Sequence, residues 1–279
     1  MIFLVRQGLR RGLIELRITL RTFSDWFGYA FSAVLLVGTL LFMGDTTVAG
    51  GFSLGAMTLP GTLGLLVAQT GVVLTAQYLL LEREDGTLLR AKALPGGMVS
   101  YLVGRIVLVG GVILISIALV LIPGLFLVDG VSVDASGWLT LLWLVPLAFL
   151  ATMPLGAVLG ALLENPRLVA FISLPVMVLA GISGIFYPIT SMPGWLQGVA
   201  QVFPVYWLGL GLRSAFLPDA FAAAELGGAW RTWQTAGVLL FWAVLGLSLA
   251  PGVLRRMARR ESGSAMAERR QRALSRVGV

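Results

Sequence analysis

The residues that could carry out chemistry are few and gather in one segment. The chain has no histidine and no cysteine, which removes the commonest general base, the commonest metal ligand and all thiol chemistry. Its one lysine, Lys92, is followed by Ala93 and Leu94, so the chain lacks the Gly-Lys-Ser/Thr loop that cradles the phosphates of ATP. We therefore expect a protein that is not itself an enzyme and that binds no cofactor or metal of its own.

The most unusual charge pattern lies between Leu81 and Pro95, in the sequence LEREDGTLLRAKALP. Acidic residues precede basic ones, the order that complements the dipole of a short helix. We predict such a helix near Gly86, with Thr87 as its N-cap and with exposed leucines. The residues alone leave two interpretations open: a helix that docks to a soluble partner, or a solvated loop between two membrane spans.

Long apolar runs must hold this segment in a bilayer. Only 12% of the 279 residues are charged and the mean hydropathy is +0.93, whereas soluble proteins carry about a quarter charged residues. A helix needs about 20 apolar residues to cross the hydrocarbon core. We predict an all-α integral membrane protein with one transmembrane domain and six spans, at residues 26–44, 54–81, 101–128, 138–163, 168–186 and 233–254.

The stretch Gly198–Leu217 is an alternative seventh span, interrupted by Pro204 and Arg213. Seven crossings would place the two basic ends of the chain on opposite sides of the membrane. Six crossings put all but two of the 20 basic residues, Arg213 and Arg231, on one side, as the positive-inside rule requires. We therefore expect six spans, with both termini, the loop 82–98 and the tail 255–279 in the cytoplasm. The net charge of +7 then reflects topology, not nucleic-acid binding.

Residues 1–25 predict an amphipathic helix in the headgroup plane, because Arg6, Arg10, Arg17 and Arg21 fall on one arc beside an apolar arc. This helix could be a membrane anchor only, or an elbow that couples to a partner.

The spans, as predicted, contain no Asp, Glu or Lys. Proton-coupled transporters usually place such groups at membrane depth, so a secondary transporter is disfavoured. A membrane enzyme or assembly factor would need polar residues converging at one depth, and the sequence shows no such cluster. Energy for transport must then come from a partner.

Two motifs resemble those of ABC-2 type ABC transporter permeases. The pattern E-R-E-x-G-T-L, with a proline seven residues on, is similar to the cytoplasmic loop of that family. The runs SGIFYP at 183–188 and MPGWLQ at 192–197, with Phe203-Pro204, resemble the C-terminal signature of its drug-resistance and lipo-oligosaccharide exporters. Many members have asparagine where this chain has Phe203.

The resemblance implies an N-terminal interfacial helix, six spans, and re-entrant or extracellular helices at residues 187–232. It implies an exporter in a bacterial cell membrane, in which two permease subunits associate with two ATPase subunits that hold ATP and Mg²⁺. We expect a homodimer of this chain, with a heterodimer left open. The expected cargo is an amphipathic drug, antibiotic or glycolipid, and a polysaccharide exporter is the alternative within the family. The residues implied in ATPase coupling are Glu82, Arg83, Glu84, Gly86, Thr87 and Leu88. Those implied in an extracellular gate are Phe186, Tyr187, Pro188, Pro193, Trp195, Phe203 and Pro204.

Overall fold

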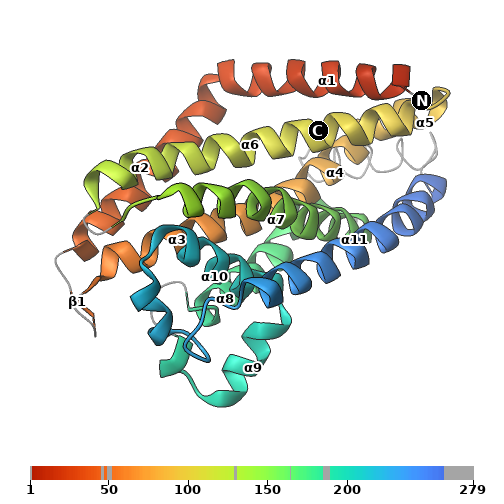
Figure 1. Cartoon of the computed structure of the whole chain (residues 1–279). Helices are drawn as coiled ribbons and strands as arrows, with labels where there is room; N and C mark the ends of the chain where they lie inside the picture. The colour runs from red at the N-terminus through yellow and green to blue at the C-terminus, as the bar shows by residue number, and fades with distance from the viewer. Residues whose placement is uncertain are drawn as a thin grey trace.

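The computed structural model describes residues 2–44, 47–48, 52–128, 131–163, 165–184 and 189–260. These residues form a bundle of long helices lying side by side, with shorter helices packed into and below it (Figure 1). The prediction of an all-α membrane protein is confirmed. The two strands form a hairpin of two residues each, β1 (Thr47–Val48) and β2 (Phe52–Ser53), paired antiparallel between the first two long apolar helices.

Within the described residues, five helices are long and apolar enough to cross a bilayer. Each overlaps a predicted span, and they begin or end within a few residues of it. They are α2 (Phe23–Gly44), the continuous stack α3 (Leu54–Ala68), η1 (Gln69–Leu74) and α4 (Thr75–Glu84), then α6 (Gly97–Leu127), α7 (Ala135–Leu162) and α11 (Thr232–Arg260).

The remaining predicted span, at residues 168–186, is shorter in the structure. It overlaps the end of the short 3-10 helix η2 (Pro166–Val169) and contains the 13-residue helix α8 (Ala170–Ile182). Thirteen residues rise about 20 Å, less than the hydrocarbon core of about 30 Å. A crossing at this place stays a prediction, and its last two residues, 185 and 186, lie outside the described part of the chain.

The ambiguous stretch Gly198–Leu217 is not one helix. It is divided into α9 (Gly194–Val202) and α10 (Pro204–Phe216), each too short to span a bilayer, so it supplies no seventh crossing. Phe203 separates them, and Pro204 begins α10 at a position where its missing N–H costs no hydrogen bond. In Figure 1, α9 projects from the bundle and α10 runs back against α3, α7 and α11. The short 3-10 helices η3 (Ile189–Ser191) and η4 (Asp219–Ala224) flank this pair.

Close packing of α7 on the α3–η1–α4 stack depends on glycine. A Cβ added to Gly160 would lie 2.7 Å from Cα of Ala76, and one added to Gly156 would overlap the carbonyl oxygen of Val72. The Gly156-x-x-x-Gly160 spacing is therefore a true helix contact. It lies beside η1, where the helix widens to i→i+5 hydrogen bonds, a feature frequent at functional sites.

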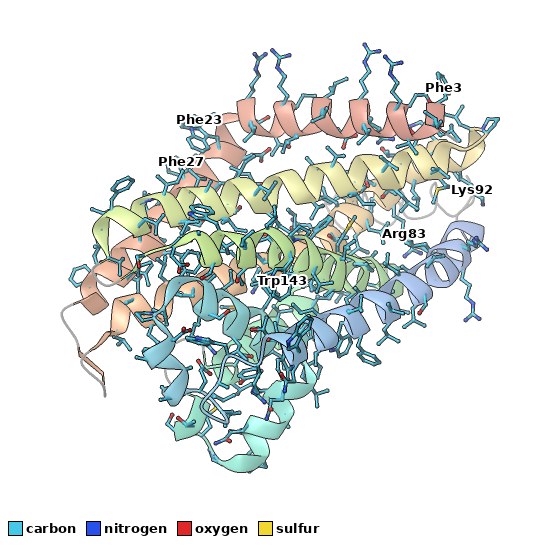
Figure 2. The ribbon with its side chains drawn as sticks, in the orientation of Figure 1. Phe3, Phe23, Phe27, Arg83, Lys92 and Trp143 are labelled. Atoms are coloured by element: carbon cyan, nitrogen blue, oxygen red, sulfur yellow. The ribbon has the colours of Figure 1, made fainter. Side chains whose placement is uncertain are left out.

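Helix α1 (Ile2–Arg21) packs lengthwise on the first half of α6 and runs in the same direction. Gly8 lies against Ser100 and Val103, and Gly12 lies against Gly104 and Val107; a Cβ on either glycine would approach a carbonyl oxygen of α6 to 2.6 Å. The four predicted anchor arginines are exposed, and Figure 2 shows long nitrogen-tipped side chains projecting from α1 on the side away from α6. An interfacial position of α1 stays a prediction, but the helix is attached to the bundle along its length.

Candidate functional site

The short helix predicted from the charge pattern exists as α5 (Thr87–Ala93), at the turn between α4 and α6. Gly86, the N-cap of α5, has φ of 76° and Gly96, the N-cap of α6, has φ of 68°, left-handed values that favour glycine at both turns. The Thr87 N–H donates to the carboxylate of Asp85 at 2.8 Å. The predicted N-cap was therefore one position late: Gly86 is the N-cap, and Asp85 supplies the capping carboxylate.

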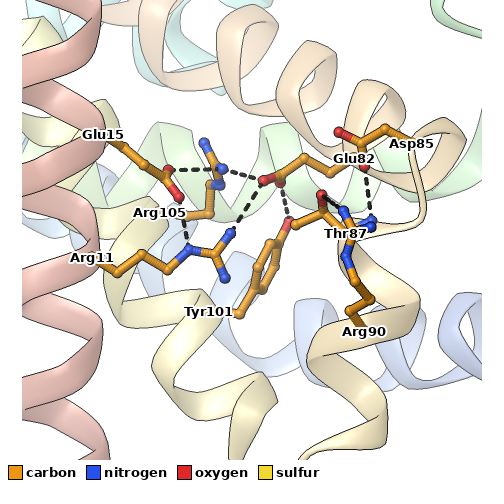
Figure 3. A network of polar contacts seen from close by, with 8 residues as sticks. All are labelled: Arg11, Glu15, Glu82, Asp85, Thr87, Arg90, Tyr101 and Arg105. Carbon is orange, nitrogen blue, oxygen red and sulfur yellow. Dashed lines mark hydrogen bonds and ion pairs between the residues drawn. The ribbon is translucent and has the colours of Figure 1, made fainter.

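A network of charged side chains joins α1, α4 and α6 just beside α5 (Figure 3). The Tyr101 hydroxyl donates to Glu82 at 2.6 Å, and the Arg105 guanidinium donates to the other oxygen of the same carboxylate. Arg105 also pairs with Glu15 at 2.9 Å, and Arg11 bridges back to Glu15 at 2.7 Å. Two acids and two bases thus balance one another across three helices.

This network is mostly hidden from solvent. The Glu82 side chain is 7% exposed and that of Arg105 is 12% exposed. Arg105 also lies over the rings of Tyr78 and Tyr101, 5.0 and 5.8 Å from their centroids, which adds cation–π attraction. Burial alone would lower the pKa of Arg11, but its hydrogen bond to Glu15 and the nearby charge of Glu82 raise the pKa further than burial lowers it. Arg11 therefore stays charged in the folded protein.

The structure revises the set of residues expected to contact an ATPase. Glu82 is buried between α4 and α6, because α4 continues as a helix to Glu84 instead of ending at Leu81. Leu88 is 1% exposed and packs in a core cluster with Tyr101 and Leu254, so it is not an exposed leucine. These two side chains cannot lie on a docking surface.

Three other predicted coupling residues have identifiable local roles. Arg83 is half-buried and donates to the carbonyl oxygen of Leu163 at 2.8 Å, which connects α4 to the end of α7. Gly86 forms the turn, and the Thr87 hydroxyl accepts from Arg90 at 3.0 Å.

The surface that α5 and its turns present outward is polar and mixed in charge. We define the α5 rim as the exposed residues Glu84, Asp85, Arg90, Lys92 and Leu94. Leu94 is 65% exposed, a large apolar side chain next to four charged ones. Such a rim can hold a partner by one apolar contact surrounded by charge pairs. Beneath it, Leu88 and Ala91 fix α5 to the bundle.

The structure describes four of the seven residues predicted to form an extracellular gate. Pro193 is the N-cap of α9, and Trp195 is 70% exposed on the same helix. Phe203 stacks on Trp242 of α11 with ring centroids 6.1 Å apart, and Pro204 is buried at the start of α10. The predicted gate residues Phe186, Tyr187 and Pro188 lie outside the described residues.

Sequence reasoning missed a buried ion pair in this region. Arg213 of α10 is completely buried, donates to Glu225 at 2.5 Å and donates to the carbonyl oxygen of Gly184 at 3.2 Å. Nearby, Arg231 donates to Gln201 at 2.9 Å and also to the Tyr206 hydroxyl. Arg213 and Arg231 were recognised only as the two basic residues outside the inner segments, and no motif pointed to their partners.

A nearly wholly apolar cavity of about 340 Å³ lies between η1, α7, α8, α10 and α11. Its walls include Val72, Leu155, Val176, Val205 and Trp242. Within the described residues there is no group of three or more acids that could hold a metal ion. The carbon-rich lining of the cavity suits the binding of apolar groups.

Comparison with known proteins agrees with this architecture. No curated protein sequence is a significant match to the chain. The sequence profile of a family described as "ABC-2 family transporter protein" matches residues 53–250. That match begins just before α3 and extends into α11, so it includes α5, α9, α10 and the apolar cavity. The chain therefore belongs to the ABC-2 family of transporter proteins.

Proposed function

We propose that this chain is the permease subunit of an ATP-driven exporter of amphipathic or lipid-like molecules. ATP and Mg²⁺ are held by a separate ATPase, the kind of partner that membership of the family implies. The α5 rim is the surface the ATPase pushes. Two copies of this chain and two ATPase subunits make the exporter, which works in a bacterial cell membrane with both termini in the cytoplasm.

The observation that carries this proposal is the way α5 is fastened to the bundle. Its outer face is exposed, while Leu88 and Ala91 pack in one cluster with Tyr101 of α6 and Leu254 of α11. Tyr101 in turn donates to Glu82 of α4. A force on the rim therefore reaches α4, α6 and α11 together, because closely packed interiors transmit displacement instead of absorbing it.

The lipid-like cargo is supported by the apolar cavity and by the stretch of α3–η1–α4 beside it. No charged residue occurs between Leu54 and Leu81, and the cavity is lined by carbon atoms almost throughout. A saccharide, with its many hydroxyls, would leave unpaired hydrogen-bonding groups against such walls. We therefore favour an apolar or amphipathic cargo over the polysaccharide alternative.

Charge reversal on the rim tests the proposal. Glu84→Lys with Asp85→Lys changes two exposed residues; losing the Asp85 cap on the Thr87 N–H should cost about 1 kcal/mol, which leaves the bundle folded. We expect the variant complex, reconstituted in proteoliposomes with its ATPase, to lose most ATP-dependent transport and most ATPase association. Asp25→Lys with Asp219→Lys is the matched control, since it makes the same charge change at two exposed acids on α2 and η4, outside the rim. Full transport by the rim variant would contradict the proposal.

A further inference from the structure

A groove lies between α6 and α11, next to α5, at the end of the bundle that carries the basic residues. Its volume is about 370 Å³. The floor of the groove is apolar and includes Met98 and Leu102 of α6 with Pro251 and Leu254 of α11. Lys92 of α5 and Arg255 of α11 lie at the mouth of the groove. Figure 2 shows Lys92 at this end of the molecule, close to the last turns of α11.

The groove separates apolar surface from charge along one direction. Lys92 precedes the start of α6 at Gly97, whereas Leu102 lies more than a turn inside that helix. Arg255 likewise follows the long apolar part of α11. Both cations therefore lie at the mouth and the carbon side chains lie deeper, the order in which a phospholipid places its phosphate and its acyl chains.

The buried side of the groove is closely packed. Leu254 is 6% exposed and Met257 is 4% exposed, and both pack in the cluster that includes Ala91 of α5 and Tyr101 of α6. The Leu102 side chain, by contrast, is 38% exposed, so the floor remains open to the surroundings. A preformed concave surface of this kind binds a ligand with little cost of reorganisation.

We propose that this groove binds one anionic phospholipid of the cytoplasmic leaflet, with its acyl chain on the Met98–Pro251 floor and its phosphate between Lys92 and Arg255. The membrane itself supplies the occupant, since the surroundings of these helices are lipid. Charge complementarity selects the class: two cations at the mouth favour an anionic headgroup over a zwitterionic one, as in other basic pockets between transmembrane helices.

Such a lipid acts as a connection between α5 and α11. Lys92 is itself one of the α5 rim residues, and Arg255 belongs to α11. A phosphate held by both side chains restrains α5 against α11. A force on α5 then displaces α11 with it, instead of bending the segment between α4 and α6. The lipid site is independent of what the exporter carries.

Lipid retention measured on the purified full-length chain tests the proposal. Native mass spectrometry follows bound lipid while phosphatidylglycerol or phosphatidylcholine is titrated into the detergent micelles. We expect wild type to prefer phosphatidylglycerol. Lys92→Gln with Arg255→Gln should weaken that preference about 25-fold, since each basic side chain near an anionic surface contributes about fivefold in affinity.

The matched control is Arg90→Gln with Arg256→Gln, which removes the same charge from the same two helices but leaves the groove lining intact. It should stay within about threefold of wild type. Equal losses in both variants, or no preference in wild type, would overturn the site. Leu102→Trp fills the floor and should also lower retention. Competition by glycerol 3-phosphate as strong as by the whole lipid would identify a free-anion site and overturn the lipid. Each variant counts as folded if, in micelles with phosphatidylcholine, its size-exclusion elution volume and its melting temperature match those of wild type.

Discussion

Glu82 is the residue whose replacement tests the network most sharply. Glu82→Gln keeps the size of the side chain and its ability to accept from Tyr101, but removes the negative charge that faces Arg105. Breaking a buried ion pair by neutralising one partner costs about 3–5 kcal/mol. Because Arg105 keeps Glu15 at 2.9 Å, we take the lower end and expect a loss of about 3 kcal/mol.

A double-mutant cycle separates this interaction from general damage. Arg105→Met leaves Glu82 without its closest cation and should also cost about 3 kcal/mol, whereas the double variant should cost about 2 kcal/mol less than the sum of the two. The assay is equilibrium unfolding of the purified chain in mixed detergent micelles. Glu84→Gln serves as the control, since that side chain is exposed and its replacement should stay within about 0.5 kcal/mol. Losses that simply add, or a Glu82→Gln cost no larger than the control, would refute the reasoning.

Three further predictions follow from packing, burial and capping. Gly12→Ala should detach α1 from α6 and clearly lower the melting temperature of the protein in detergent. Gly28→Ala, where a Cβ meets nothing within 4 Å, should raise that melting temperature slightly through the higher helix propensity of alanine. Glu225→Gln should cost about 3 kcal/mol because it leaves the wholly buried Arg213 unpaired, and Arg213→Met in the same chain should recover part of that loss in the same unfolding assay. The pKa of Asp134 is lowered below its usual 3.8 by the Gly137 N–H and the Ser136 hydroxyl. The ionised Asp134 that caps α7 therefore stabilises the folded protein at neutral pH, and this stabilisation is lost as the pH falls through the lowered pKa. The melting temperatures of wild type and Asp134→Asn should consequently converge at acidic pH.

The positions of the long helices could be predicted because they depend on a local property, the length of an apolar run. Five predicted spans coincide with helices of the structure to within a few residues. The same criterion failed at Glu82, since hydropathy ends where the first charge occurs but α4 continues for another turn. The helix does so because Glu82 finds Tyr101 and Arg105 on α6. Partners on other helices leave no mark near Glu82 in the sequence.

Glycines illustrate the same limit. Gly8 and Gly12 weaken an isolated helix by about 1 kcal/mol each, so from sequence they argue against a stable α1. In the structure they are the places where α1 and α6 come closest, and any side chain there would collide with α6. Likewise, Gly156 and Gly160 gain meaning only from the position of Val72 and Ala76 opposite them. Spacing identifies a candidate contact, and the opposing surface decides whether it is one.

We expect a separate ATPase to push on the α5 rim, and disulfide cross-linking measures this contact directly. The chain has no cysteine, so each introduced thiol reports one position. With Leu94→Cys on the rim, we predict cross-linking to single cysteines on the ATPase in the assembled, ATP-hydrolysing complex. Val34→Cys, 69% exposed on α2, and Leu88→Cys, buried beneath the rim, should give none. An active complex in which Leu94→Cys never cross-links while Val34→Cys does would contradict the account.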